Sequence, residues 1–216
     1  MEEMHDMIRV LVADDHAVVR EGVKQILANL DDMVVEDEAE NGQEVLEKVL
    51  QKNFDVILLD ITMPGRSGLE VLKEIVELRP KMPVLILSMH PEEQYAVRAL
   101  RAGASGYLTK ASAPQELIGA IRKVSQGGKY VTASLAEKLA LELNLDKDKP
   151  RHELLSNREY EVMLMLASGK SVSEIAEEIC LSVKTISTYR ARIMDKMVMK
   201  KNAELTIYAV NNRLLG

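Results

Sequence analysis

The chain contains one cysteine, Cys180, no tryptophan and one phenylalanine among its 216 residues. A single thiol excludes an internal disulfide and is too few for a zinc site built on thiolates. The scarcity of large aromatic residues, set against twelve methionines, indicates aliphatic cores. We expect Cys180 to be a packed, small apolar residue rather than a redox sensor.

Long apolar runs are also missing. The longest, such as those at 56–59 and 84–87, fall far short of the ~20 residues that a membrane-spanning helix needs. The acidic first seven residues carry no apolar signal region. We therefore expect a cytoplasmic protein without membrane contact. A chain of 216 residues suits one medium and one small domain.

The formal net charge of −6 conceals two parts of opposite sign. Residues 1–150 hold 18 Lys and Arg against 26 Asp and Glu, a net −8, whereas residues 151–216 hold 10 against 8, a net +2. Within 182–201, six basic residues accompany one acid. This asymmetry indicates different partners for the two parts. A solvated helix can have the same composition, so charge alone does not identify a nucleic-acid partner.

The first 125 residues alternate short aliphatic runs with stretches of helical period. Five strands alternating with five helices predict a parallel sheet with helices on both faces. We expect a doubly wound, five-stranded α/β domain, although the strand order cannot be read from the sequence. The predicted strands are 8–13, 33–39, 55–60, 83–88 and 105–109.

After residue 126 this alternation stops. We expect residues 1–126 to form the α/β domain, 127–152 a linker with a helix at 133–145, and 153–216 a small all-α domain. In the last part, helical periodicity on both sides of a short turn near residue 181 predicts a helix-turn-helix.

Polar side chains stand at the ends of four predicted strands. Asp14 and Asp15 follow the first strand, Asp60 ends the third, Ser88 ends the fourth and Lys110 follows the fifth. Ligands of doubly wound sheets bind beyond the carboxyl ends of the strands. Each residue alone could be an ordinary loop residue or helix cap, but together they indicate a site. Three converging carboxylates need a cation, and their oxygens suit Mg²⁺.

The chemistry of this site would centre on Asp60. Its carboxylate could attack a phosphoryl group while Mg²⁺ (or Mn²⁺) neutralises charge on the phosphoryl oxygens. Lys110 would add a positive charge, and the Ser88 hydroxyl could bind the group once it has arrived. Thr62 can offer its backbone carbonyl to the metal, and Pro64-Gly65 forces the turn that opens this corner.

The second helix of the predicted helix-turn-helix has two faces. The apolar face is predicted to comprise Val183, Ile186, Tyr189, Ile193 and Met197. The polar face comprises Lys184, Thr185, Thr188 and Arg192, the kind of side chains that a DNA major groove admits. We expect Arg190, Lys196, Lys200 and Lys201 to meet phosphates or solvent. A solvated face on an ordinary helical bundle would explain this segment equally well.

Four segments, VLVADDHAVVREGV, DVILLDITMPGRSGLEVL, VLILSMH and RALRAGASGYLTKASAPQELIGAI, resemble the receiver domain of bacterial two-component response regulators over about residues 8–125. The resemblance implies a flavodoxin-like receiver that is phosphorylated on Asp60 and binds Mg²⁺ at Asp14, Asp15 and Asp60. It also implies a switch hydroxyl at Ser88, a switch aromatic at Tyr107 and a phosphoryl-binding Lys110. Phosphorylation would draw Ser88 inward and let the Tyr107 ring follow. Many receivers have proline after the lysine, where this chain has Ala111.

Residues 154–216 resemble the LuxR-type helix-turn-helix, so the whole chain is similar to a NarL/FixJ-type response regulator. The resemblance implies a sensor histidine kinase and double-stranded DNA as partners, with RNA polymerase as a further candidate. It implies a homodimer on phosphorylation, with the last helix (about 203–212) pairing the subunits. Such a protein regulates transcription and dephosphorylates itself, and it is not an enzyme with turnover of an external substrate.

Two other hypotheses stay open at the level of sequence. A phosphatase or phosphotransferase with Asp60 as nucleophile needs an acid or base beside it, but Thr62 stands two positions on and no substrate cap is visible. A phosphate-independent DNA-binding protein with a degenerate receiver is opposed by the complete set of acids, hydroxyl and lysine. The acids at 36–38 in the second predicted strand have no functional explanation from sequence.

Overall fold

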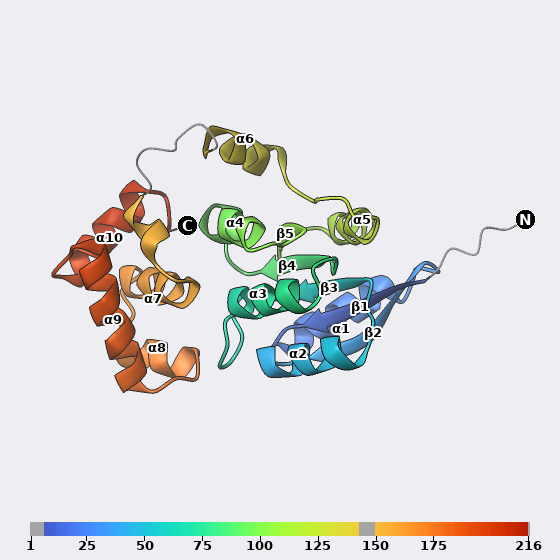
Figure 1. The fold of residues 1–216 in the computed structure, drawn as a ribbon, viewed down its shortest axis with the longest axis horizontal. Coiled ribbons are helices and arrows are strands. Elements are labelled where there is room, and N and C mark those ends of the chain that lie inside the picture. Colours follow the sequence, from blue (N-terminus) through green and yellow to red (C-terminus); the bar gives the residue numbers. More distant parts are fainter. Residues whose placement is uncertain (1–6, 143–149, 216) are drawn as a thin grey trace, which may run out of the picture. The chain divides into compact units, whose positions relative to one another are not determined.

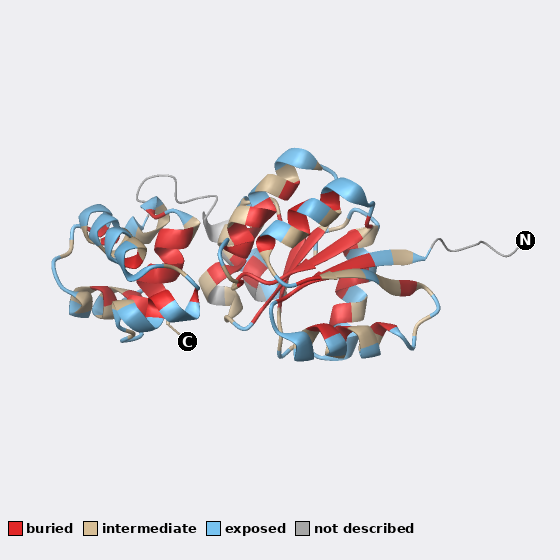
Figure 2. Cartoon of the chain, turned by 90° about the horizontal axis from the view of Figure 1, so that it is seen from below, coloured by how far each residue is buried: buried red, intermediate tan, exposed pale blue. Residues whose placement is uncertain are grey.

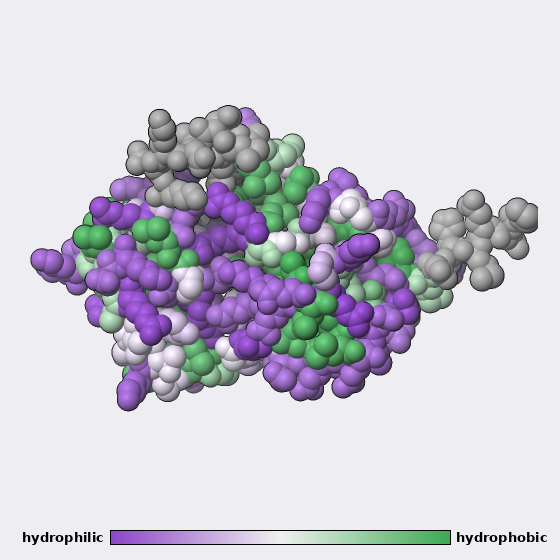
Figure 3. Space-filling view, in the orientation of Figure 1, coloured by the Kyte–Doolittle hydropathy of each residue, from purple (hydrophilic) through white to green (hydrophobic). Residues whose placement is uncertain are grey.

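The computed structural model describes residues 7–142 and 150–215 and contains two compact units, which divide between Thr132 and Ala133 (Figure 1). In those described ranges no helix has the length and apolarity required to cross a bilayer. The face drawn in Figure 3 is mainly hydrophilic, with separate hydrophobic patches.

The first unit is a five-stranded, all-parallel sheet with the order β2-β1-β3-β4-β5, which confirms the predicted doubly wound fold. The chain runs outward from β1 to one edge and then from β3 to the other, and this leaves a switch point between β1 and β3. The strands are β1 (Ile8–Ala13), β2 (Met33–Ala39), β3 (Val56–Leu59), β4 (Val84–Ser88) and β5 (Gly106–Thr109). The helices are α1 (Ala17–Leu27), α2 (Gly42–Gln51), α3 (Gly68–Leu78), α4 (Glu92–Arg101) and α5 (Pro114–Ser125).

The central strands are apolar along their length because both of their faces are covered. Alternate side chains of β1, β3 and β4, among them Val12, Leu58 and Leu85, pack with Val23 of α1 and Ile121 of α5. The residues between them point to the opposite face, since side chains alternate along a strand. Figure 2 shows strands that are buried and helices that are buried on one side and exposed on the other.

The acidic edge strand β2 is held by basic residues of the neighbouring helices. Lys48 of α2 and Lys52, the C-cap residue of that helix, lie 2.6 and 2.8 Å from the carboxylate of Asp37. Glu38 pairs with Arg20 and Lys24 of α1 at 3.0 and 2.9 Å. Burial alone would raise the pKa of Asp37, but the hydrogen bonds from the two lysines lower it to about 2. These ion pairs give Asp37 and Glu38 of β2 a structural role.

The second unit is helical, as expected. Its elements are α6 (Ala133–Glu142), a 3₁₀ turn η1 (Arg151–Leu154), α7 (Asn157–Ala167), α8 (Val172–Glu178), α9 (Val183–Met197) and α10 (Asn202–Asn211). Ser156, Ser171 and Ser182 begin α7, α8 and α9, because each side chain accepts a hydrogen bond from the third backbone N–H of its helix. Helix α9 packs against α7 and α8, and α10 packs against α7. The last residues of the helix expected at 133–145, and the linker residues 143–149, lie outside the described ranges.

Two expectations for the helix-turn-helix are wrong. Cys180 is exposed, and it adopts the left-handed φ of 53° in the turn between α8 and α9, outside both helices. Val183 is 50% exposed at the start of α9, before the buried stripe of Ile186, Ile193 and Met197 begins.

Candidate functional site

Asp14, Asp60 and Lys110 meet at one edge of the sheet. Backbone hydrogen bonds continue the strand pairing to these positions, with Asp60 N–H donating to the Ala13 carbonyl at 2.9 Å and Lys110 N–H to the Ser88 carbonyl at 2.8 Å. Because parallel strands present their carboxyl ends together, the three side chains converge as the sequence predicted.

The segment after Asp60 folds back tightly beneath it. Gly65 has a φ of 78°, which favours glycine. The Gly68 N–H donates to the Ile61 carbonyl at 2.8 Å, and a Cβ at Gly68 would lie 1.9 Å from the Asp60 carbonyl oxygen. Ser67 then begins α3 in a capping box with Glu70. The two glycines therefore allow α3 to start directly under the strand end.

Lys110 lies between two buried carboxylates. Its Nζ is 2.6 Å from Asp14 Oδ2 and 2.7 Å from Asp60 Oδ2, and all three side chains are at most 5% exposed. Burial, with a smaller contribution from Asp14, raises the pKa of Asp60 to about 6 against the opposing effect of Lys110. Burial alone would lower the pKa of Lys110, but Asp60 and Asp14 raise it. One ammonium thus pairs with two buried carboxylates, and the net negative charge that remains can attract a second cation.

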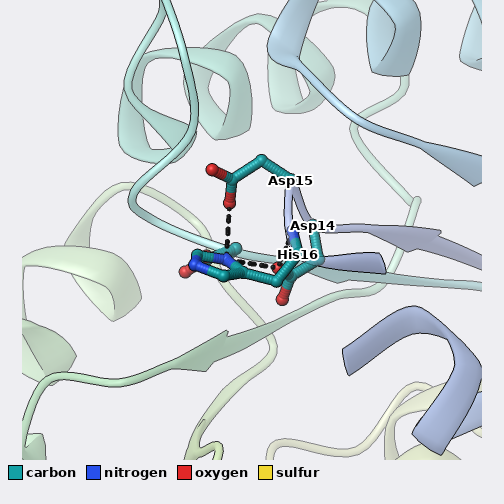
Figure 4. A group of neighbouring side chains, drawn as sticks. Asp14, Asp15 and His16 are labelled. Atoms are coloured by element: carbon teal, nitrogen blue, oxygen red, sulfur yellow. Dashed lines mark hydrogen bonds and ion pairs between the residues drawn. The ribbon is translucent and has the colours of Figure 1, made fainter. Parts of the chain in front are cut away.

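Asp15 and His16 complete the acidic cluster at the end of β1 (Figure 4). The imidazole Nδ1 of His16 lies 2.8 Å from Asp15 Oδ1 and 3.2 Å from Asp14 Oδ1. One potential ligand atom from each of Asp14, Asp15, His16 and Asp60 falls within 4.8 Å of the others. Sequence reasoning missed His16, although its place directly after an acid pair was a usable signal.

The cluster fits a divalent cation. Asp14 Oδ2 is buried and lies 2.6 Å from Lys110 Nζ, the same ammonium that pairs with Asp60. One ammonium shared by two buried carboxylates leaves net negative charge, and carboxylate oxygens suit a hard metal ion. Asp14, Asp15 and Asp60 together could therefore hold Mg²⁺.

Ser88 and Tyr107 both bind His90, a residue that sequence reasoning missed. The buried Ser88 Oγ accepts a hydrogen bond from the His90 N–H at 3.2 Å, and the Tyr107 hydroxyl donates to the His90 carbonyl at 2.8 Å. The His90 ring lies 3.2 Å from the Thr62 hydroxyl, and the Thr62 N–H donates to Asp60 Oδ1 at 3.3 Å. No local pattern signals a contact between residues 28 positions apart.

Tyr107 is only 1% exposed, so its ring is buried in this structure. The peptide bond between Lys110 and Ala111 is trans.

The polar face of α9 forms a shallow hollow of about 320 Å³ lined by the four predicted residues and Tyr189. Lys184 and Arg192 are exposed. The Thr188 hydroxyl donates to the Lys184 carbonyl, and the Thr185 hydroxyl lies 2.7 Å from Ser182 Oγ. The two threonines thus contribute mainly methyl groups, and the two basic residues contribute the free donors.

Arg190 and Lys196, expected to meet phosphates or solvent, also have partners within the helical unit, and Lys196 is exposed. Arg190 donates to the side-chain carbonyl of Asn202 at 2.9 Å. Lys196 pairs at 2.6 Å with Glu159, whose side chain is 4% exposed. Burial alone would raise the pKa of Glu159, but Lys196 and Ser156 lower it. Both basic residues therefore stabilise the helical unit, for which the amphipathic pattern of α9 alone gave no sign.

Comparison with known proteins matches both units. The model of the response regulator receiver domain matches residues 10–122, and that of the luxR family of bacterial regulatory proteins matches residues 153–209. The chain is 37% identical over 210 residues to Response regulator GacA of Pseudomonas viridiflava, covering 97% of this chain and 98% of that protein. The chain belongs to the two-component response regulators. Response regulator UvrY of Escherichia coli (strain K12) is 36% identical over 209 residues, 96% of each chain.

Solved response regulators share the architecture. RcsB from Salmonella enterica serovar Typhimurium, bound to promoter rprA in the presence of the phosphomimetic BeF₃⁻, is 27% identical with a TM-score of 0.65, covering 94% of this chain and 98% of that chain. A structure of two RcsB dimers bound to two parallel DNAs is 25% identical with a TM-score of 0.60, covering 95% and 98%. The expected NarL/FixJ-type response regulator is thereby confirmed. A receiver joined to a DNA-binding domain indicates a regulator rather than an enzyme.

Proposed function

We propose that this response regulator accepts a phosphoryl group on Asp60 from a sensor histidine kinase, and that phosphorylation switches dimerisation and sequence-specific DNA binding. The observation that carries the proposal is the position of Asp60, at a strand end with its carboxylate 2.7 Å from the buried ammonium of Lys110 and beside Asp14. Of the acids in the cluster, Asp60 alone directly follows the central strand β3, next to the switch point of the sheet.

Each residue has a defined part in phosphoryl transfer. A carboxylate oxygen of Asp60 forms the bond to phosphorus while the bond from phosphorus to the donor breaks and the donor keeps the electron pair. Lys110 holds its positive charge against the phosphoryl oxygens. Mg²⁺, or Mn²⁺, bound by Asp14, Asp15, Asp60 and the Thr62 carbonyl would neutralise negative charge on the same oxygens. Attack of water on phosphorus then breaks the bond to the Asp60 oxygen, releases inorganic phosphate and returns the free carboxylate, which is the self-dephosphorylation we expect.

The switch runs through Ser88 and Tyr107 by way of His90. A phosphoryl group adds about −1.5 to −2 charges and strong acceptor oxygens, which attract the Ser88 hydroxyl. Ser88 Oγ now accepts the His90 N–H, and Tyr107 holds the His90 carbonyl. Reorienting Ser88 therefore changes the bonding of the loop that leads into α4. Couplings of this type are worth ~1–3 kcal/mol, enough to shift a balanced equilibrium.

In the DNA-binding unit, α9 would enter the major groove with the face formed by Lys184, Thr185, Thr188 and Arg192. Helix α10 supports pairing of subunits, because it exposes an apolar strip. Ile207 and Val210 are 62% and 59% exposed on that helix, one turn apart. RNA polymerase stays a prediction only, because none of the residues described above identifies a binding surface for it.

Phosphoryl labelling tests the proposal. Full-length protein is incubated with acetyl phosphate with and without Mg²⁺, and intact-mass spectrometry counts the phosphoryl groups. The parent should gain one group only with Mg²⁺, and Asp60→Asn should gain none. Asp55→Asn is the matched control, because Asp55 lies just before β3 and pairs with Arg9 at the surface; it should label like the parent. Undiminished labelling of Asp60→Asn would refute the assignment.

A further inference from the structure

The orientation of His16 is not explained by the role of the neighbouring acids in phosphoryl transfer. His16 occupies the N-cap position of α1, but its side chain makes no capping hydrogen bond. Its imidazole is 62% exposed, yet Nδ1 faces the carboxylates of Asp14 and Asp15 at 3.2 and 2.8 Å (Figure 4). The ring therefore points into the acidic cluster although most of the side chain is exposed to solvent.

The spacing of these atoms suits ligands of one ion. In an octahedral site with bonds of about 2.1 Å, adjacent ligand atoms lie about 3.0 Å apart and opposite ones about 4.2 Å apart. The two distances from His16 Nδ1 correspond to adjacent positions. The ligand atoms of Asp14, Asp15, His16 and Asp60 all fall within 4.8 Å of one another. This limit of 4.8 Å exceeds the opposite-ligand distance of about 4.2 Å, so side chains would have to close by about half an ångström to surround a single ion.

We propose that His16 Nδ1 is a direct ligand of the divalent-ion site and that it biases the site toward a transition-metal ion such as Mn²⁺ relative to Mg²⁺. The proposal rests on the metal site of the proposed function and adds a nitrogen donor to it. Imidazole suits first-row transition metals, whereas Mg²⁺ prefers oxygen ligands and keeps several waters. Loss of the His16 imidazole should therefore weaken the binding of Mn²⁺ much more than the binding of Mg²⁺.

A different role for the same contact gives the opposite result. If His16 only occupied the carboxylates as a hydrogen-bond donor, an arriving ion would have to displace it. Removing the ring would then strengthen binding of every divalent ion, with no preference between Mn²⁺ and Mg²⁺. The affinities of a His16→Ala variant for the two ions therefore distinguish a ligand from a competitor.

The test uses the full-length chain as parent, His16→Ala and His152→Ala. His152 lies in the other unit, where its ring contacts Tyr208, so it controls for loss of a histidine in general. Free Mn²⁺ is measured by electron paramagnetic resonance, and Mg²⁺ affinity is measured by competition against Mn²⁺. Electron spin-echo modulation of bound Mn²⁺ reports a directly coordinated ¹⁴N.

We expect His16→Ala to lower the affinity for Mn²⁺ by about tenfold or more, which is the usual effect of changes around a metal site. The affinity for Mg²⁺ should change far less, and the ¹⁴N modulation should disappear. His152→Ala should match the parent in all three readouts. If His16→Ala binds Mn²⁺ as tightly as the parent or more tightly, or keeps the ¹⁴N modulation, the His16 proposal is overturned. The proposed function stays intact in that case as long as the protein still binds Mg²⁺. A parent that binds neither ion overturns both.

Discussion

Replacing Asp60 with asparagine should stabilise the metal-free protein at neutral pH. Burial and Asp14 raise the pKa of Asp60 from its ordinary value of 3.8 to about 6. Since each tenfold change in proton affinity is worth about 1.4 kcal/mol, keeping Asp60 ionised costs the folded state about 3 kcal/mol. Asparagine has nearly the same shape without the charge, and its side-chain carbonyl can still accept a hydrogen bond from Lys110.

The sign of the pH dependence follows from linkage. The folded state holds its proton on Asp60 to a higher pH than the unfolded state, so the parent loses stability as pH rises from about 4 to about 6. The advantage of Asp60→Asn should be absent below about pH 4 and complete above about pH 6. Added Mg²⁺ should stabilise the parent and reduce the difference, because an ion that binds only the folded state shifts the equilibrium toward it.

Urea unfolding followed by circular dichroism, in the presence of a chelator and across this pH range, measures the effect. Asp55→Asn is a control of opposite sign. Burial alone would raise the pKa of Asp55, but its pairing with Arg9 lowers it; removing that charge should not stabilise the protein. The reasoning is refuted if Asp60→Asn is no more stable than the parent at neutral pH, or if its advantage is the same at acid pH.

Three further predictions concern the edge strand, the switch and the DNA-reading face. Asp37→Asn should lower the free energy of unfolding by only about 1 kcal/mol at neutral pH, because solvent screens the ion pairs with Lys48 and Lys52 where they are exposed. The folded pKa of Asp37 lies below its unfolded value, so this loss, measured by urea unfolding, should fade as pH falls from about 4 toward about 2. A loss that stays constant over that range contradicts the prediction. Ser88→Ala removes the acceptor for the His90 N–H and should still take up phosphate, but its gain in DNA affinity on phosphorylation should shrink by about fivefold or more; the same gain as the parent would exclude this route. Lys184→Ala should reduce the preference for selected over scrambled DNA, and an equal loss of affinity for both DNAs would show that Lys184 does not read bases. Lys200→Ala should lower the affinity for both DNAs alike and reduce the log–log salt slope by about 0.9, or change nothing if Lys200 faces only solvent.

The parts of the fold that local patterns determine were predictable. Strands β1 and β2 occupy the predicted ranges, and β3, β4 and β5 are shorter by one or two residues at their ends. The strand order was not predictable, since it depends on which helix covers which face. The convergence of Asp14, Asp60 and Lys110 was predictable because all parallel strands end at the same edge.

What the sequence could not supply are contacts made by tertiary packing. The pairing of Lys196 with Glu159 joins residues 37 positions apart, and that of His90 with Thr62 joins residues 28 positions apart. The left-handed backbone of Cys180 in its turn is not signalled by the surrounding run of mixed polar and apolar residues. The ion pairs of Asp37 and Glu38 in β2 could be predicted only with the knowledge that β2 is an edge strand flanked by basic residues of α1 and α2.

The central claim is that a phosphoryl group on Asp60 controls DNA binding. The most direct test recovers DNA from a genomic fragment library with full-length parent and Asp60→Asn, each with and without acetyl phosphate in Mg²⁺. We predict that phosphorylated parent enriches fragments carrying a common pair of half-sites about one helical turn apart, ~34 Å, and that acetyl phosphate changes nothing for Asp60→Asn. Equal enrichment by the parent with and without acetyl phosphate, or an equal response of Asp60→Asn, would contradict the account.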